Sequence, residues 1–330
     1  MAEGTTELER AIRSQPEHLE RLLHAGDLHA EVETLRQSHR VWLVGTGTSQ
    51  HAAELGAMML HDAGRAATAV PSIAFVNHAP PVGPDDLVVL ISHNAGAETA
   101  YAAAAYSLAV GGGLRVLAIT RQDSGLPHAL ETVPKERSHT YSVSYTAVLI
   151  LLARLAAALG AEHISTDALE LVPKAVQEAI DSPGTDRLPI PARALVVFGE
   201  GPAAVTAREG ALKVREASRF LAEGYDAEYL LHGSAVPLTP DDHLIALAPP
   251  DSDGLVEAVA KAAEAESILV TRLPETAEDL PTLLAQIPLT VRLQLLALRF
   301  ATERGQNPDV VISGAWAGDA LWAIGSPKAS

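Results

Sequence analysis

The sequence predicts an α/β protein made of two similar domains in tandem, each a parallel sheet with helices on both faces. The first observation behind this prediction is a glycine pattern that occurs twice at one offset. The three matched pairs are Gly45 with Gly199, Gly47 with Gly201, and Gly56 with Gly210. Residues 84–92 and 240–248 form a second matched pair of segments. Similarity over this length indicates two copies of one folding unit.

The second observation is the alternation of short apolar runs with helical patterns, which implies parallel sheets covered on both faces. We expect strands at 40–44, 67–70, 87–91, 114–120, 194–198, 243–248 and 267–270. We expect helices at 7–36 with a break near Pro16, and at 51–63, 98–109, 144–160, 202–221, 253–265 and 288–304. The predicted organisation is an N-terminal helical segment (1–36), a first domain (37–180), a linker around 181–186 and a second domain (186–330) that includes a C-terminal tail.

The third observation is that only the first copy keeps its hydroxyl groups. Ser49 corresponds to Ala203, and Ser92 corresponds to Ala248. Ligands of parallel sheets bind at the carboxyl ends of the strands, which is where both serines are predicted to lie. We therefore expect a polar ligand in the first copy alone.

Composition limits the classes of protein. The 330 residues are 48% hydrophobic and 20% charged, as in soluble globular proteins, and suffice for two domains. The chain has no cysteine, which excludes disulfides, thiolate ligands and a cysteine nucleophile. Residues 1–7 lack the pattern of a signal peptide, and no segment is expected to span a bilayer; the nearest, 147–159, is interrupted by Arg154. A cytoplasmic location is the resulting expectation.

The formal net charge of −17 is unfavourable for binding nucleic acid or an anionic membrane. It does not exclude a small phosphorylated ligand, because backbone N–H groups at the start of a helix hold phosphate without a surplus of lysine.

The glycine turn at residues 45–49 follows a predicted strand and resembles the start of a dinucleotide-binding motif. Gln50 stands where that motif has its third glycine, and the strand at 67–70 is not followed by an acidic residue. Binding of a nicotinamide cofactor is therefore unfavoured. The glycines still indicate that the backbone approaches another group closely.

Residues 92–99 lie between a predicted buried strand and a helix. Ser92, Asn94 and Thr99 offer hydroxyl and amide groups beside free N–H groups at the helix start, which together could hold an anion. Ordinary N-capping by Ser92 or Asn94 is the alternative.

Glu209, Lys213 and Glu216 have the i, i+4, i+7 spacing of one helix face. A general base held by a cation and a solvated row of ion pairs are both consistent with this spacing. His232 follows a short predicted helix and is either a surface residue or an acid/base group, since an imidazole exchanges protons near neutral pH. The 13 histidines form no metal-binding motif, so we expect neither a catalytic metal nor a cofactor.

Five segments together resemble the sugar isomerase (SIS) domain family in its double-domain form. They are residues 12–17, the first phosphate loop 45–49, the glutamate helix 209–216, the histidine loop 231–233 and the turn 305–309. The sequence is similar to the isomerase part of glucosamine-6-phosphate synthase and to related sugar-phosphate isomerases and deglycases. The resemblance covers nearly the whole chain and implies two flavodoxin-like three-layer sandwiches.

The resemblance also implies roles for single residues. Glu216 corresponds to the base that moves a proton between C1 and C2 of the open sugar, His232 to the group that helps to open the ring, and Glu209 to a neighbour of both. Phosphate would be held by residues of the two loops, namely Thr46, Gly47, Thr48, Ser49, Ser92, Asn94 and Thr99. A histidine that reaches into the neighbouring subunit's site implies a homodimer with shared active sites.

The sequence departs from the family at three places. Residues 92–99 are longer than the family's Ser-Gln-Ser-Gly-Glu-Thr, residues 142–146 replace a frequent Ser-Thr-Lys, and the tail 316–330 does not match the synthase. With no cysteine to start a glutaminase domain, glutamine is not expected to be the nitrogen donor. The expected function is aldose–ketose isomerisation of a hexose or aminosugar phosphate, with or without gain or loss of an amine. A sugar-phosphate sensor without turnover is the alternative.

Overall fold

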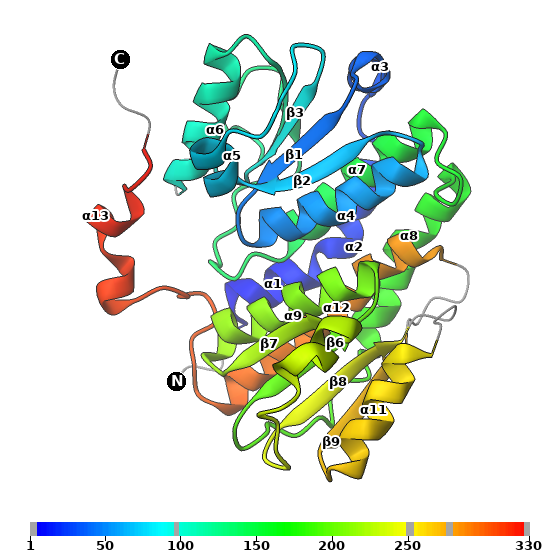
Figure 1. Ribbon diagram of the computed structural model, residues 1–330, viewed down its shortest axis with the longest axis vertical. Helices are drawn as coiled ribbons and strands as arrows, with labels where there is room; N and C mark the ends of the chain where they lie inside the picture. The colour runs from blue at the N-terminus through cyan, green and yellow to red at the C-terminus, as the bar shows by residue number, and fades with distance from the viewer. Residues whose placement is uncertain (1–4, 96–98, 249–253, 275–279, 327–330) are drawn as a thin grey trace. The chain divides into compact units, whose positions relative to one another are not determined.

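A computed structural model describes residues 5–95, 99–248, 254–274 and 280–326 (Figure 1). The chain forms two compact units whose segments interleave along the sequence. Within the described residues, unit 1 comprises 5–16, 137–142 and 171–311, and unit 2 comprises 17–136, 143–170 and 312–326. The domain boundaries expected from the sequence stay a prediction.

Unit 2 contains a parallel five-stranded sheet with the order β2-β1-β3-β4-β5. Its strands are β1 (Val41–Gly45), β2 (Ala67–Pro71), β3 (Leu87–Ile91), β4 (Arg115–Thr120) and β5 (Leu130–Glu131). Its helices are α2 (Gln15–Leu23, in this unit from Glu17), α3 (His29–Gln37), α4 (Thr48–Asp62), α5 (Ser72–His78), α6 (Ala100–Gly111), α7 (Val143–Leu159), the start of α8 (Thr166–Asp181), η2 (Gly314–Ala317) and α13 (Asp319–Trp322). The central strands β1 and β3 are buried along their whole length.

Unit 1 contains a parallel four-stranded sheet with the order β7-β6-β8-β9. Its strands are β6 (Leu195–Gly199), β7 (Ala222–Asp226), β8 (His243–Ala248) and β9 (Leu269–Pro274). Its helices are α1 (Glu7–Arg13), the rest of α8, α9 (Pro202–Ser218), α10 (Ala227–Tyr229), η1 (Leu230–Ser234), α11 (Leu255–Ala265) and α12 (Thr282–Glu303). The order second, first, third, fourth strand is common to both sheets, and the predicted class of two tandem α/β domains is confirmed.

The third glycine of each matched set brings two helices close together. A Cβ atom at Gly210 would lie 2.3 Å from Leu293 of α12, and one at Gly56 would lie 2.6 Å from Leu152 of α7. At Gly210 the clash extends to the Leu293 Cβ, so a side chain there would force α9 and α12 apart, whereas at Gly56 a side chain would displace the Leu152 methyl groups. This explains why the sequence carries a glycine in the middle of two long helices, where glycine costs helix stability.

Several boundaries differ from the prediction. Residues 7–36 form three helices, α1 to α3; the first break is at Ser14, and Pro16 lies in the first turn of α2, where its missing N–H costs nothing. Helix α9 ends at Ser218, three residues before its expected end at residue 221, and the strand β7, which was not predicted, begins at Ala222. Helix α12 starts six residues before Pro288, and α5, α8 and β5 were not predicted.

By length and composition, α12 comes nearer to a membrane span than residues 147–159, which were expected to come nearest. This helix of 22 residues is long and apolar enough to cross a membrane by length and composition. In the structure, 78% of its most apolar stretch is buried against the rest of the protein. The helix also carries the buried polar side chains Gln286, Arg292 and Gln294, so it serves here as the central helix of unit 1.

An arginine–aspartate pair ties the first strand of each sheet to the loop that precedes its third strand. In unit 2, Asp86 is 1% exposed and accepts hydrogen bonds from Trp42 Nε1 at 2.9 Å and the Gly83 N–H at 2.8 Å, with Arg40 Nη2 at 3.2 Å. In unit 1, Asp242 pairs with Arg193 in the same way. Burial alone would raise the pKa of Asp86, but its donors outweigh burial and hold the pKa below its ordinary value.

Replacing Asp86 by alanine should therefore destabilise the protein by about 3–5 kcal/mol, because three donors lose their buried acceptor. The folded-state pKa is lowered, so this stability should be present above the unfolded pKa of about 3.9 and be lost as the pH falls through the folded pKa. Urea unfolding at several pH values measures both effects. Asp85→Ala at an exposed neighbour is the matched control; an equal loss in the two variants would contradict the role of the buried carboxylate.

Candidate active site

The first phosphate loop leaves the carboxyl end of β1 and enters α4. Gly47 is the N-cap residue of α4 with φ +56°, a conformation that L side chains rarely adopt. A Cβ atom at Gly45 would lie 2.4 Å from the Ser49 carbonyl oxygen, so only glycine permits this tight turn. Thr46 and Gly47 are exposed, and Thr48 and Ser49 are half-buried in the first turn of the helix. The loop thus presents hydroxyl groups at the positive end of a helix of 15 residues.

The corresponding turn of unit 1 has the same backbone but no hydroxyl groups. Gly201 has φ 52° and ψ −125°, close to the 56° and −127° of Gly47. Pro202 and Ala203 follow it, and Ala203 is fully buried. The two turns therefore share their geometry but differ in chemistry, as the replacement of Ser49 by Ala203 in the second copy predicts.

The second loop follows β3, which pairs directly with β1, so both loops leave the same edge of the sheet. Ser92 is 8% exposed, and its N–H donates to the Ile119 carbonyl at 3.1 Å. Residues 96–98 lie outside the described residues. Thr99 is the N-cap residue of α6, and its side chain makes no capping hydrogen bond. The alternative that Ser92 or Asn94 caps the helix is therefore wrong, because the cap position belongs to Thr99.

A buried carboxylate that sequence reasoning missed supports the second loop. Glu136 is 6% exposed and accepts hydrogen bonds from the Ser144 N–H at 3.0 Å, the Ser144 hydroxyl and the Val143 N–H at 3.3 Å. Its own N–H donates to His93 Nε2 at 3.1 Å. The departures from the family at 92–99 and 142–146 thus meet in one network. Glu136 was assigned no role from the sequence, because no motif or spacing pattern singles it out.

Helix α9 carries the three charged residues expected on one face, and that face is buried. Lys213 Nζ lies 2.6 Å from Glu216 Oε2 and 3.4 Å from Glu209 Oε1. The side chains of Lys213 and Glu209 are fully buried, and that of Glu216 is 20% exposed. The alternative of a solvated row of ion pairs is therefore wrong. Burial follows from the position of α9, which packs against α12, β6 and β7.

The environment of Glu216 favours its neutral form. Burial raises the pKa of Glu216, while the Lys213 ammonium opposes the rise and the Glu209 carboxylate adds to it. A carboxyl group that is easier to protonate than usual, one fifth exposed and held by a fixed ammonium, can accept a proton and return it. This is the property required of a general base that works on a carbon acid.

His232 lies in the same unit, in a short irregular helical segment after β7. Its backbone and that of Gly233 are non-helical, with Gly233 at φ +105°, so the chain turns sharply at this point. The imidazole is 75% exposed, and its Nε2 lies 4.0 Å from Glu228 Oε1. An exposed imidazole on a kinked segment is available for contact with a ligand or with another chain.

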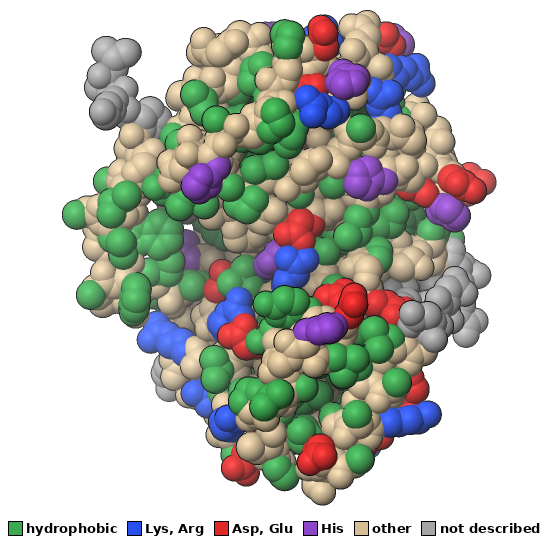
Figure 2. Space-filling view, viewed as in Figure 1, with side chains coloured by type: hydrophobic (Ala, Val, Ile, Leu, Met, Phe, Trp, Pro, Cys, Tyr) green, Lys and Arg blue, Asp and Glu red, His purple; other side chains and the backbone are tan. Residues whose placement is uncertain are grey.

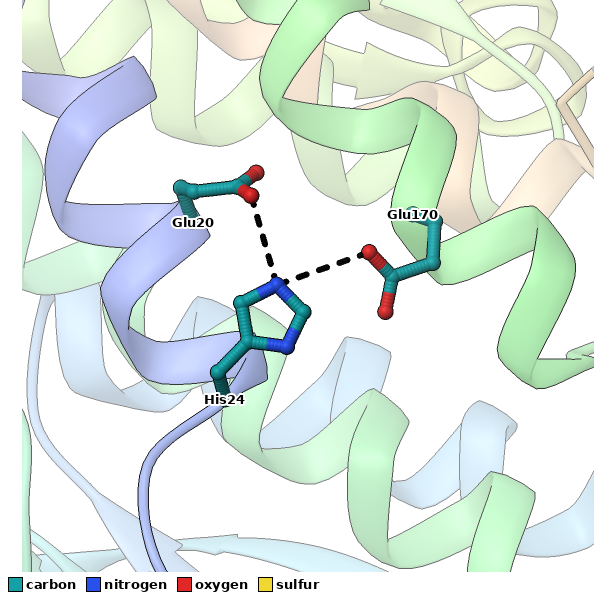
Figure 3. Close-up of side chains that lie close together, drawn as sticks. All are labelled: Glu20, His24 and Glu170. Atoms are coloured by element: carbon teal, nitrogen blue, oxygen red, sulfur yellow. Dashed lines mark hydrogen bonds and ion pairs between the residues drawn. The ribbon is translucent and has the colours of Figure 1, made fainter.

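One group of three side chains among the described residues could hold a metal ion. Glu20 and His24 of α2 meet Glu170 of α8, with His24 Nε2 at 3.3 Å from Glu20 Oε1 and 3.6 Å from Glu170 Oε2 (Figure 3). All three side chains are 45–57% exposed. They lie on helices α2 and α8 and not in the loops at the carboxyl edge of the sheet, and their contacts are explained as ion pairs between two helices.

Comparison with known proteins identifies the family. The sequence model of the SIS domain matches residues 34–159 and 190–277, and the chain belongs to the SIS domain family. A glutamine–fructose-6-phosphate aminotransferase (isomerizing) of Chlorobaculum tepidum is 29% identical over 327 residues, which cover 87% of this chain and 52% of the relative. A homologue of the same name in Thermococcus kodakarensis is 26% identical over 338 residues, covering 91% and 56%. The chain spans about half the length of these curated relatives.

Solved structures share the fold over nearly the whole chain. Tagatose-6-phosphate ketose/aldose isomerase from Escherichia coli matches with a TM-score of 0.77 at 20% identity, covering 93% of this chain and 96% of that one. Glucosamine-6-phosphate deaminase from Thermotoga maritima matches with a TM-score of 0.72 at 19% identity, covering 92% and 97%. The protein is thus a double SIS-domain protein, similar to phosphosugar isomerases.

Replacing Lys213 by methionine should destabilise the protein by about 3–5 kcal/mol near neutral pH, because two buried carboxylates lose their counter-charge. The pKa of Glu216 is already raised, so its contribution to stability is present below the unfolded value of about 4.3 and is lost as the pH rises through the folded value. Without Lys213 the folded pKa rises further, and the loss of stability between acid and neutral pH becomes larger.

Unfolding by urea at pH 5 and pH 8 measures this difference. Lys261→Met is the matched control, because Lys261 makes an i, i+4 pair with Glu257 at 3.5 Å but is 69% exposed. A Lys213 variant that lost no more stability at pH 8 than at pH 5 would contradict the buried charge network.

Proposed function

We propose that this protein is a sugar-phosphate isomerase that interconverts an aldose and a ketose, with an aminosugar phosphate among its candidate substrates. The observation that carries the proposal is the partly exposed Glu216 carboxylate, 2.6 Å from the buried Lys213 ammonium. The family supports the substrate class, since SIS relatives are named for fructose 6-phosphate, tagatose 6-phosphate and glucosamine 6-phosphate.

In the proposed reaction, Glu216 removes the proton from the carbon next to the carbonyl group. The electron pair of that C–H bond forms the C=C bond of an enediol, and the carbonyl oxygen gains a proton. Glu216 then returns a proton to the former carbonyl carbon, and the other enediol hydroxyl loses its proton as its oxygen forms the new carbonyl group. One proton is gained and one is lost at oxygen, so the reaction needs no oxidant or reductant. Lys213 holds the carboxylate in place, and Glu209 holds the ammonium. His232 moves a proton between the anomeric hydroxyl and the ring oxygen when the sugar ring opens.

The phosphate group would be bound by the two loops of unit 2. Thr46, Gly47, Thr48 and Ser49 stand at the start of α4, and Ser92, Asn94 and Thr99 belong to the neighbouring loop. A phosphate at the first turn of a helix gains hydrogen bonds from N–H and hydroxyl groups together with the helix dipole. That these loops and Glu216 serve one substrate is part of the proposal, and it rests on the family resemblance.

A homodimer is also part of the proposal. Ile312, Trp316, Leu321, Trp322 and Ile324 are 40–76% exposed, and hydrophobic side chains gather over this C-terminal segment (Figure 2). Exposed apolar side chains at this density are typical of an interaction surface. Light scattering that gave the mass of a single chain, 34.6 kDa, would contradict the dimer.

The first prediction concerns proton transfer. Incubated in D₂O with hexose 6-phosphates, the protein should catalyse exchange of deuterium into C1 and C2. Glu216→Gln should reduce the exchange rate by at least about 10³-fold, since general-base catalysis contributes roughly that factor. Binding of the sugar phosphate should stay intact. Proton NMR follows exchange, and calorimetry follows binding. Glu223→Gln, at an exposed glutamate of β7, is the matched control.

Two results separate the alternatives. Undiminished exchange in Glu216→Gln would remove Glu216 from the role of base. If the unaltered protein bound a sugar phosphate tightly but catalysed no exchange, the protein would be a sugar-phosphate sensor without turnover. The departure of residues 92–99 from the family's second loop supports this alternative.

The second prediction concerns the phosphate loops. Ser49→Ala or Thr99→Ala should each raise KM for the phosphorylated sugar about 10- to 100-fold, because each removes a hydrogen bond to a charged group. kcat should change much less, since the phosphate is bound equally in the ground state and the transition state. Ser107→Ala at an exposed position of α6 is the control. If kcat fell while KM stayed constant, the hydroxyl groups would not act on the phosphate.

A further inference from the structure

A polar cavity lies in unit 2, between the α2–α3 connection, α3, α7 and the start of α8. Its volume is about 390 Å³, enough for a small metabolite. The floor is apolar and includes Leu23, Val32 and Leu169. The ionisable side chains that line it are Arg36, Arg154, His29, Asp27 and Glu170.

Arg154 is the unusual member of this wall. It interrupts the apolar helix α7 and is partly buried there. Its Nη2 donates to the Gly26 carbonyl at 3.1 Å, but its Nη1 is buried and has no hydrogen-bond partner within the described residues. Burial lowers the pKa of the Arg154 guanidinium. The charge therefore carries a desolvation cost that the described residues do not offset with an ion pair.

The cavity is also lined by a second cationic side chain, Arg36, and by two acidic side chains, Asp27 and Glu170. Arg36 Nη2 donates to the Ala158 carbonyl at 3.2 Å and forms no ion pair in the described part of the chain. Asp27 Oδ1 accepts the His29 N–H at 2.9 Å, and Glu170 lies 3.6 Å from His24. Two guanidinium groups thus border the cavity, and neither forms an ion pair among the described residues.

The cavity lies at the edge of the unit opposite to the phosphate loops. Helix α4 begins at Thr48 in the first phosphate loop and ends at Asp62, about 20 Å further on for 15 residues. The Asp62 carbonyl accepts the Glu162 N–H at 3.2 Å, and the Asp62 carboxylate accepts the His163 N–H at 2.9 Å. The segment from α7 to α8 that forms one wall of the cavity is therefore anchored at the far end of α4.

We propose that this cavity is a binding site for a small oxyanion, a phosphate or carboxylate group gripped by Arg36 and Arg154. Guanidinium groups bind such anions through two parallel N–H donors, and Arg154 has a buried donor to give. Asp27 and Glu170 stand where they can accept hydrogen bonds from hydroxyl groups of the same molecule. The proposal does not depend on the reaction proposed for Glu216, and the site differs from the phosphate loops in every residue.

The test uses the full chain with Ser49→Ala and Thr99→Ala, so that the phosphate loops are weakened. Calorimetric titrations are made with inorganic phosphate and with malonate, and at least one of the two anions should bind. The anion that binds more tightly shows whether the site prefers a phosphate or a carboxylate group. Adding Arg154→Met should weaken binding of the preferred anion at least about 10-fold, the size expected for one charge-assisted hydrogen bond. Arg115→Met is the matched control, because Arg115 is an exposed arginine that also donates to a backbone carbonyl, that of Gln37.

A stability measurement guards against misfolding of the variant. Without added anion, Arg154→Met should be as stable as its parent or more stable, because an uncompensated, partly buried charge has been removed. Added phosphate or malonate should raise the midpoint of thermal unfolding of the parent more than that of the variant. Arg36→Met should weaken anion binding as well and provides the same test if Arg154→Met does not fold.

Two outcomes would overturn the proposal. One is the lack of any binding of either anion by the parent. The other is equal binding by the Arg154 variant, the Arg36 variant and the Arg115 control, which would mean that the anion responds only to the overall charge of the surface.

Discussion

The buried ammonium group of Lys213 is the interaction on which the rest of the site depends. It lies between two carboxylates on one face of α9, at 2.6 Å and 3.4 Å, in a part of the protein that water scarcely reaches. A buried charge of either sign without a partner would be prohibitively costly, so the three residues are only tolerable together. The arrangement leaves Glu216 partly exposed and with a raised pKa, which is the condition for taking up and releasing a proton.

Glycine places this network and the phosphate loops. Gly47 and Gly201 turn the chain from a central strand into a long helix with nearly equal dihedral angles, and Gly56 and Gly210 allow a second helix to pack closely on that helix. The same backbone thus carries hydroxyl groups at one helix start and buried charges along the other helix. The two units therefore differ in the chemistry of their side chains, while the glycines keep the scaffold unchanged.

Much of this could be predicted from the sequence. Continuous apolar runs located the central strands within one or two residues, because a parallel strand that is buried on both faces needs apolar side chains at every position. The spacing of Glu209, Lys213 and Glu216 placed these three residues on one helix face. Spacing could not decide whether that face was buried, because burial depends on α12 and β7, which lie elsewhere in the chain. Glu136 was missed for a similar reason: its contact with His93 joins residues 43 apart in the sequence, and no spacing pattern links it to Ser144. Pro288 misplaced the start of α12, because the chain tolerates proline inside a buried helix.

The most direct test of this account is a titration of the Glu216 carboxyl group by ¹³C NMR in protein labelled at glutamate, with its resonance assigned by its absence in Glu216→Gln. The account predicts a pKa above the ordinary value for glutamate, and a further rise when Lys213 is replaced by methionine. A Glu216 pKa at or below the ordinary value for glutamate, unchanged when Lys213 is replaced, would contradict it.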